Sequence, residues 1–267
     1  RAAVRSWMQR KFDIDIPLSQ IAAAVGSKEY VVTTPQWMKL RTPSRDTVLF
    51  PAVSYPSYAM GATLSGCRPV AVPMTPTGGL DLSKISADDA KRALMIWMNS
   101  PSNPTGALDD MEAVVNWGRA NDVPVFSDEC YVEFTWQGKP TTALQYGTQG
   151  VIALHSLSKR SNLAGLRVAF YAGDADIVHY LKEVRKHAGL MVPGPAQAAG
   201  VVALNDDDSV KVQADIYRRR LERTATVLSK WSGRNIELPA GGFYLWFDAT
   251  DVWEFAERLA TEGWALV

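Results

Sequence analysis

Residues 155–167 read His-Ser-Leu-Ser-Lys-Arg-Ser-Asn-Leu-Ala-Gly-Leu-Arg, and they continue from the apolar run that begins at Val151. An apolar run of this length, rich in β-branched residues and flanked by turn-forming residues, predicts a buried strand over residues 151–156. The polar residues of the quoted stretch then emerge where that strand ends. In sheets built from parallel strands, ligands bind beyond the carboxyl ends of the strands. The stretch therefore predicts both a strand and a ligand-binding edge.

The residue types in this stretch suit an anionic ligand. Ser156 and Ser158 offer hydroxyls, and Arg167 offers a rigid fork of N–H donors that matches a phosphate group. Lys159 lies eight positions before Arg167, and a lysine beside an apolar strand suits Schiff-base chemistry. A Ser-x-Ser-Lys motif by itself is equally typical of a polar loop, so other segments have to decide between the two interpretations.

The chain on either side of this stretch alternates between strand-like and helix-like segments. Such alternation predicts an α/β fold with a largely parallel sheet covered by helices on both faces, because parallel neighbours need crossover connections. Helices are expected over residues 58–65 and 109–119, with an apolar stripe on the second. The expected strands are residues 47–51, 69–73, 93–99, 123–127, 151–156 and 167–171.

The pattern changes after about residue 174. Helices are expected over residues 176–187, 196–204, 210–231 and 252–261, and strands over residues 243–247 and 264–267. This pattern predicts a smaller α+β unit that is incomplete at its C-terminal end. We therefore expect a large domain over residues 1–190 and a small C-terminal domain, with its connecting helices, over residues 191–267.

Composition excludes several classes of protein. The 267 residues carry 28 Lys and Arg against 28 Asp and Glu, so there is no positive field to attract nucleic acid. The apolar runs are shorter than the roughly 20 residues of a membrane-spanning helix. Two cysteines, Cys67 and Cys130, do not make a disulfide scaffold or a cysteine-rich metal site. We expect a soluble, cytoplasmic protein without a metal, a nucleic-acid partner or a membrane partner.

Three further segments carry residues typical of a binding site. Residues 99–106 read Asn-Ser-Pro-Ser-Asn-Pro-Thr-Gly, which alone indicates a strand-to-helix loop. Residues 126–131 read Phe-Ser-Asp-Glu-Cys-Tyr, where Asp128 is either a buried site carboxylate or a helix cap followed by an exposed Glu129. Residues 25–29, Val-Gly-Ser-Lys-Glu, place a glycine before a helix start, a common but unspecific phosphate site.

Together these segments resemble the fold-type I pyridoxal-phosphate aminotransferases of class I and II. The Asn-Pro-Thr-Gly, the Asp-Glu-x-Tyr and the Ser-x-Ser-Lys followed by Arg occur in the order expected for that family, and the resemblance covers nearly the whole chain. It implies a seven-stranded, mostly parallel sheet in the large domain, and pyridoxal 5′-phosphate as cofactor. It also implies a homodimer with active sites at the subunit interface.

The resemblance also implies roles for individual residues. Lys159 would form the Schiff base with the cofactor and shuttle the proton during catalysis, and Asp128 would pair with the pyridinium nitrogen. Asn103, also expected to contact substrate, and Tyr131 would hydrogen-bond the ring oxygen O3′, and Tyr55 would stack on the ring. The catalytic residues are thus Lys159, Asp128 and Tyr131. The phosphate would be held by Ser27, Lys28, Ser156, Ser158 and Arg167.

Residues 156–174 and 185–197 are similar to the actinobacterial succinyldiaminopimelate aminotransferases. This narrower resemblance implies exchange of amino and keto groups between N-succinyl-LL-2,6-diaminopimelate and 2-oxoglutarate, in lysine and diaminopimelate biosynthesis. Arg185 and His187 are candidates for the active-site entrance, although a helix end explains His187 more simply. The resemblance also implies an inter-subunit tyrosine before Arg1 and a carboxylate-binding arginine after Val267, so we expect the natural chain to be longer than these residues.

Two alternative functions use the same residues. A lyase or another class I and II aminotransferase acting on a different amino acid would also need Lys159, Asp128 and Tyr131. A regulator that binds the cofactor beside a DNA-binding module belongs to a different class, and the neutral charge disfavours it.

Overall fold

A seven-stranded sheet forms the centre of the computed structural model, which describes residues 1–249 and 251–263. The strand order is β1-β7-β6-β5-β4-β2-β3, and the four neighbouring pairs from β6 to β3 are parallel. The strands are β1 (Ile21–Ala24), β2 (Thr47–Pro51), β3 (Arg68–Val72), β4 (Ala93–Asn99), β5 (Val125–Asp128), β6 (Val151–Ser156) and β7 (Ala169–Gly173). The expected α/β fold with a mostly parallel sheet is confirmed.

The direction of β7 determines which residues meet at one edge of the sheet. β7 pairs antiparallel with both β6 and β1. Its first residue, Ala169, therefore lies opposite Ser156, the last residue of β6. Residues just before β7, including Arg167, consequently reach the edge where β4, β5 and β6 end. A sheet of uniform direction would place Arg167 at the opposite edge.

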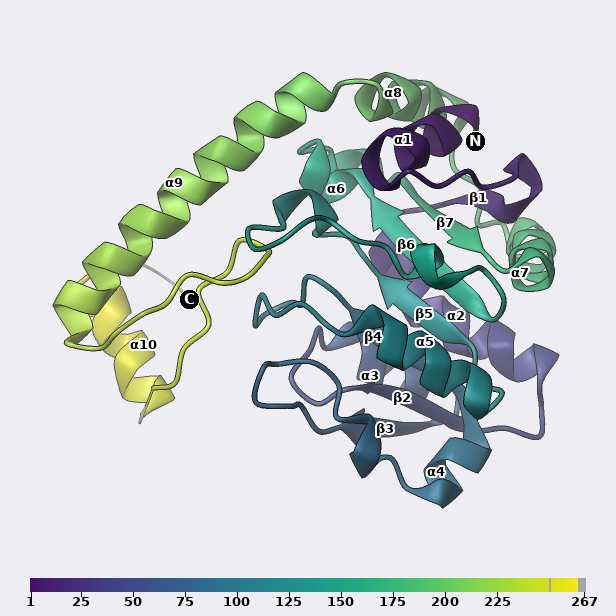
Figure 1. Cartoon of the computed structure of the whole chain (residues 1–267), viewed down its shortest axis with the longest axis horizontal. Helices are drawn as coiled ribbons and strands as arrows, with labels where there is room; N and C mark the ends of the chain where they lie inside the picture. Colours follow the sequence, from purple (N-terminus) through teal and green to yellow (C-terminus); the bar gives the residue numbers. More distant parts are fainter. Residues whose placement is uncertain (250, 264–267) are drawn as a thin grey trace.

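Helices cover both faces of this sheet (Figure 1). Alternate strand residues point to opposite faces, so Trp97 and Phe126 pack with one set of helices while Ile96 and Val125 pack with the other. The first set is α2 (Ser27–Arg41), α3 (Ser57–Leu64) and α7 (Ala175–His187). The second set is α1 (Ala2–Phe12), α5 (Met111–Ala120) and α8 (Gly194–Leu204). Short helices α4 (Ala87–Arg92) and α6 (Leu157–Arg160) precede β4 and follow β6.

The C-terminal part of the described chain leaves the sheet and then returns to it. Helix α9 (Asp207–Ser232) extends away from the sheet, and the segment after it comes back towards the ends of the strands (Figure 1). Asp206 caps the start of α9 by accepting from the Ser209 N–H, and Gly233 ends it in the left-handed conformation. Helix α10 (Val252–Thr261) follows.

Several expectations for individual elements need correction. The strand expected over residues 243–247 is wrong, because the structure assigns these residues to no strand; Gly241, just before them, forms an isolated bridge with Thr135. The sequence Ile-Ala-Ala-Ala of β1 was not predicted, because alanine has little strand preference. β7 begins two residues later than expected, so Arg167 precedes the strand.

Two other expectations remain open. The strand over residues 264–267 lies outside the described residues. The division between residues 190 and 191 stays a prediction; it falls between α7 and α8. Within residues 1–249 and 251–263, no helix combines the length and the apolar character that crossing a bilayer requires.

Candidate active site

The carboxyl ends of β4, β5 and β6 border a cavity of about 120 Å³. Seven of the ten residues predicted for the site line it: Ser27, Tyr55, Asn103, Asp128, Tyr131, Ser158 and Lys159. Four residues that the sequence reasoning did not assign to the site complete the lining: Tyr58, Asn99, Cys130 and Tyr244. Segments more than 200 residues apart in the sequence thus converge on one space.

Asp128 ends β5 at the buried end of this cavity. Only 6% of the residue is exposed, and its carboxylate accepts hydrogen bonds from the Tyr58 hydroxyl at 3.0 Å and the Cys130 N–H at 3.2 Å. Burial raises the pKa of Asp128, and the hydrogen bonds from Cys130 and Tyr58 act against that rise. A carboxylate held in this way is oriented and ready to pair with a cationic group in the cavity.

The neighbouring Glu129 rules out the simpler interpretation of this segment, in which Glu129 is exposed. Glu129 is fully buried, and its carboxylate accepts from the Ala143 N–H at 2.9 Å. Its second oxygen lies 3.2 Å from Nε2 of His155, which is also buried. The two acidic residues therefore point into different parts of the interior, and Asp128 is the one that lines the cavity.

The loop after β4 is shaped by Asn99. Its amide donates to the backbone oxygen of Asp128 at 2.9 Å, and its side-chain oxygen accepts from the Asn103 N–H at 2.7 Å. These two bonds connect the ends of β4 and β5 and direct Asn103 towards the cavity. The Asn103 amide then donates to the Tyr131 hydroxyl at 3.3 Å.

Lys159 lies in α6, which starts directly after β6. Ser156 caps this helix by accepting from the Ser158 N–H at 3.1 Å, and its hydroxyl also donates to the Ser158 hydroxyl at 2.9 Å. Ser156 is therefore buried beneath the lining, whereas Ser158 and Lys159 reach it. The Lys159 ammonium lies 5.6 Å from the centre of the Phe243 ring.

Gly26, Ser27 and Arg167 form the outer end of the site. Gly26 precedes α2 with φ +77°, and a Cβ added there would lie 1.9 Å from Nη2 of Arg167. The guanidinium therefore lies against the backbone at the start of a helix, where free N–H groups favour anions. Arg167 is exposed and itself adopts a left-handed conformation, φ +55°, with one bond to the Ala164 oxygen at 2.7 Å.

Lys28 and Tyr55 lie side by side at the same end. The Lys28 ammonium is 5.4 Å from the centre of the Tyr55 ring, within the range of a cation–π contact. Lys28 is exposed and does not line the cavity, whereas half-buried Tyr55 does. Tyr55 also meets Tyr58 edge to face, with 6.1 Å between ring centres.

Tyr131 connects the cavity to the C-terminal segment. Its hydroxyl lies 3.0 Å from that of Tyr244, and burial together with this contact raises the pKa of Tyr131. Tyr58 and Tyr244 are the clearest residues that sequence reasoning missed. Tyr58 is the second residue of α3 and stands three positions after Tyr55, and Tyr244 was assigned to a strand.

Two arginines near the predicted motifs lie away from this cavity. Arg160, to which the sequence gave no role, is buried and pairs with Glu133 and Asp207 at 3.1 Å each. Arg185, a candidate for the entrance, is buried, pairs with Glu29 and stacks near the rings of Tyr30 and Tyr171. His187 is the last residue of α7, in agreement with its simpler interpretation.

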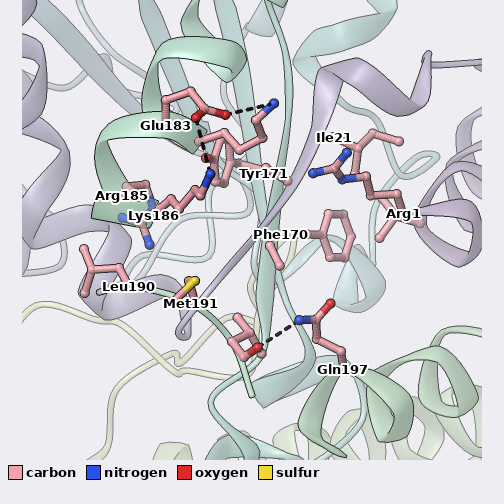
Figure 2. Close-up of a pocket in the computed structure, with 15 residues that line it drawn as sticks. Arg1, Ile21, Phe170, Tyr171, Glu183, Arg185, Lys186, Leu190, Met191 and Gln197 are labelled. Atoms are coloured by element: carbon pink, nitrogen blue, oxygen red, sulfur yellow. Dashed lines mark hydrogen bonds and ion pairs between the residues drawn. The ribbon is translucent and has the colours of Figure 1, made fainter. Parts of the chain in front are cut away.

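Arg185 borders a larger cavity, of about 490 Å³, between α7, β1 and β7 (Figure 2). An ion pair between Glu183 and Lys186 and a hydrogen bond from Gln197 to the Val192 oxygen lie along its wall. None of the predicted site residues lines it. The larger cavity is therefore separate from the candidate active site. The described residues contain no cluster of His, Cys, Asp and Glu that could hold a metal ion.

Comparison with known proteins identifies the family. The family model described as Aminotransferase class I and II matches residues 1–267. The chain is 36% identical to a 4-dedimethylamino-4-oxo-anhydrotetracycline transaminase of Streptomyces rimosus, over 98% of this chain and 72% of that protein. It is also 36% identical to an LL-diaminopimelate aminotransferase of Aquifex aeolicus, over 98% of this chain and 70% of that protein. A probable aminotransferase of Mycobacterium tuberculosis is 36% identical over 92% of this chain, which spans only 58% of that relative.

Solved structures agree in fold. Apo-BacF from Bacillus subtilis superposes with a TM-score of 0.92 at 25% identity, covering all of this chain and 74% of that one. A probable N-succinyldiaminopimelate aminotransferase from Thermus thermophilus gives a TM-score of 0.88 at 27% identity, covering 98% of this chain and 73% of that one. Class I and II aminotransferases depend on pyridoxal phosphate. From the sheet, the cavity and these relatives together, the chain belongs to the class I and II aminotransferase family of pyridoxal-phosphate enzymes.

Proposed function

We propose that the whole protein is a transaminase that carries out its chemistry in the cavity at the ends of β4, β5 and β6. The observation that carries this proposal is the convergence of Lys159 and Asp128 on one small cavity. The residues present fit pyridoxal phosphate: a buried carboxylate at one end suits a ring nitrogen, and a guanidinium against a helix start suits a phosphate. When bound, the cofactor supplies an electron sink for charge that develops at the substrate Cα.

Lys159 and Asp128 would carry the main catalytic roles. The Lys159 amine would hold the cofactor covalently and, once released by substrate, move the proton of the substrate Cα. Asp128 would keep the ring nitrogen protonated, and Tyr58 and the Cys130 N–H would hold its carboxylate in place. In these two roles the residues would contact different atoms of one cofactor, and both residues line the same cavity.

Three further side chains would fix the ring. Tyr55 would stack on its face, as its position in the lining and its half-buried state allow. Asn103 and Tyr131, 3.3 Å apart, would donate to the ring oxygen, and Asn103 would also contact substrate. The phosphate would be bound by Ser27, Lys28, Ser158 and Arg167, with Ser156 acting by fixing the Ser158 hydroxyl.

A lysine exchange tests this assignment. The full-length protein with bound pyridoxal phosphate should show an absorbance band near the visible edge, and Lys159→Ala should abolish it. Lys28→Ala removes a cation that contacts Tyr55 but does not line the cavity, so the band should remain while the affinity for the cofactor falls. An unchanged band in Lys159→Ala would show that another residue attaches the cofactor.

For the substrate, we propose N-succinyl-LL-2,6-diaminopimelate with 2-oxoglutarate as amino acceptor. Support comes from the motif-bearing residues 156–174 and 185–197 and from relatives whose names refer to diaminopimelate or its N-succinyl derivative. Purified full-length protein should form glutamate from 2-oxoglutarate with the succinylated donor faster than with free LL-diaminopimelate. Preference for the free amino acid, or turnover only with an unrelated amino acid, would contradict the narrow assignment and leave the transaminase proposal standing.

We also propose that the protein acts as a homodimer with active sites at the subunit interface, as expected from its family. Sedimentation of the full-length protein should give twice the monomer mass.

The products of the reaction distinguish the alternative functions. Release of ammonia or carbon dioxide without glutamate formation would indicate a lyase, which the same lining residues also suit. Specific DNA binding without turnover would indicate a regulator.

A further inference from the structure

The C-terminal segment around Gly241 is fixed against the rim of the cavity. The indole of Trp136 donates to the Gly242 oxygen at 2.6 Å, and the Gly242 and Gly241 N–H groups donate to Phe134 and Gly106 oxygens at 2.9 and 2.8 Å. The contact is too close for larger residues: a Cβ on Gly241 would lie 2.5 Å from Cβ of Pro101. The aromatic side chains that follow Gly242 are therefore held in place.

The anchored segment brings the Tyr244 hydroxyl into contact with that of Tyr131. The two hydroxyl oxygens are 3.0 Å apart, and Tyr244 lines the same cavity as Lys159. The Asn103 amide approaches the Tyr131 hydroxyl at 3.3 Å. Because an amide N–H can only donate, the Tyr131 oxygen accepts this bond and keeps its single proton for another partner.

The destination of that proton depends on Tyr244. Between two phenols, either can be the donor, so the Tyr131 proton can point to Tyr244 when no anionic oxygen is near. When an anionic oxygen binds beside Tyr131, the proton must turn towards it, and Tyr244 must then donate to Tyr131. A hydrogen bond received by Tyr131 also polarises its O–H and strengthens the bond that it donates.

We propose that Tyr244 is a positioning residue whose hydroxyl donates to Tyr131 and so directs the Tyr131 proton to an anionic oxygen of the bound ligand. This proposal rests on the proposed function, in which that oxygen belongs to the pyridoxal ring. It adds a residue from the C-terminal segment to the group that tunes the cofactor. Burial, the largest cause, raises the pKa of Tyr131, which agrees with a phenol that stays protonated and donates.

The aromatic cluster offers a matched control for the experiment. Tyr217 packs with its ring centre 5.0 Å from that of Phe243, as Tyr244 does at 5.1 Å. The Tyr217 hydroxyl, however, donates to Asn162 at 2.8 Å. Tyr244→Phe and Tyr217→Phe therefore each remove one phenolic hydroxyl from the same cluster. Only Tyr244→Phe removes a hydroxyl that contacts Tyr131.

The test measures cofactor binding and the pH titration of its absorbance in full-length protein, besides activity. In Tyr244→Phe we expect about fivefold weaker binding of pyridoxal phosphate, the size typical of one lost hydrogen bond. The pH midpoint of the bound cofactor should rise by about 0.7 units, the same fivefold factor. Tyr217→Phe should match the wild type in both. In a Tyr131→Phe background, Tyr244→Phe should have no further effect, because the Tyr131 hydroxyl that Tyr244 would contact is already absent.

The outcomes separate this proposal from the proposed function. An unchanged affinity and midpoint in Tyr244→Phe, with a normal band in the wild type, would overturn the role of Tyr244 alone. An equal shift in Tyr217→Phe, or an additive effect on top of Tyr131→Phe, would also overturn it and indicate general loosening of the cluster. Failure of the wild type to bind pyridoxal phosphate would overturn the proposed function and this role together. The free energy of unfolding of each apoprotein shows whether the variants are folded.

Discussion

The two ends of the candidate site are built in different ways. At the Asp128 end, the groups are side chains on or beside strands, buried and hydrogen-bonded to one another, such as Asp128 and Tyr58. At the Arg167 end, the charged side chains of Lys28 and Arg167 are exposed, and the arrangement depends on backbone geometry, with Gly26 and Arg167 both at positive φ. With the proposed function, the buried end would control the electronic state of a bound ring, whereas the outer end would control how tightly the ligand is held. Variants at the buried end should therefore lose mainly kcat, and variants at the outer end should lose mainly affinity for the cofactor.

The largest effect is expected from Asp128→Asn. Replacing the carboxylate by an amide removes the charge that would keep the ring nitrogen protonated, so we expect kcat of the full-length enzyme to fall at least about a hundredfold. The apoprotein should not lose stability, because an ionised buried carboxylate is itself costly. Single-turnover kinetics and urea unfolding measure the two quantities. Asp122→Asn, at an exposed carboxylate, serves as the control, and a smaller loss at Asp128 than tenfold would contradict the assigned role.

The next largest effect is expected from Gly26→Ala at the outer end. The new Cβ would lie 1.9 Å from Nη2 of Arg167, so the guanidinium must move. We expect binding of pyridoxal phosphate to weaken about tenfold or more, since Arg167 loses its alignment with the phosphate. Gly189→Ala is a matched control, because Gly189 has φ +79° but open space around the added Cβ. Equal losses of affinity in the two variants would show that backbone strain, rather than displacement of Arg167, is responsible.

A smaller effect at the buried end is expected from Tyr58→Phe. The change removes the donor to Asp128 at 3.0 Å and leaves the ring in place. We expect kcat to fall about three- to tenfold, the equivalent of one hydrogen bond, with cofactor affinity changed less than in Gly26→Ala. Tyr180→Phe removes a hydroxyl that donates to the Trp37 oxygen at 2.7 Å, and neither residue lines the cavity, so this change should leave kcat unchanged. A wild-type kcat in Tyr58→Phe would show that the hydrogen bond from Tyr58 is not what orients Asp128.

The smallest effect on the site is expected from a change at a second carboxylate, Asp109, which does not line the cavity. Burial raises its pKa from 3.8 to about 6, although one of its oxygens accepts from the Leu80 and Asp110 N–H groups. The folded state therefore holds this proton more tightly than the unfolded state, and stability is lost as pH rises from about 4 to about 6. Asn keeps the accepting oxygen without the charge.

Asp109→Asn should consequently match the wild type near pH 4 and be more stable at pH 7 by about 1–2 kcal/mol, a value reduced for the partial exposure of the group. Urea unfolding at several pH values measures this difference. A constant difference across pH 4–7 would mean that Asp109 is ionised throughout. In contrast to Asp128→Asn, this change should leave kcat unchanged, because Asp109 does not line the cavity.

Much of the fold and site was predictable from local sequence. The runs that became β2, β4 and β6 are apolar and rich in strand-forming residues, and their polar C-terminal neighbours mark the edge. The positions of Lys159, Asp128 and Tyr131 beyond strand ends could be predicted from these runs, whereas their roles came from the resemblance to a family. The resemblance to a family then connected motifs that are distant in the sequence.

Other features depend on contacts that no local pattern contains. Tyr244 reaches the cavity only because Gly241 and Gly106 allow their backbones to approach, and a glycine pair in the sequence does not reveal its partner. Residues 243–247 have the composition of a strand, but no strand in the described chain pairs with them, and composition cannot supply a partner. β1 has no strand-like composition, and its position next to β7 alone makes it a strand.

The long helix α9 also affects the order in which the site can be completed during synthesis. Residues of the sheet, including Asp128 and Lys159, leave the ribosome before α9, and Tyr244 follows only after that helix. At ordinary rates of translation, synthesis of the residues between Lys159 and Tyr244 takes several seconds. During that time the nascent chain can form the floor of the cavity without its Tyr131–Tyr244 contact. The proposed role of Tyr244 predicts that the cofactor would bind such a chain more weakly than the finished protein.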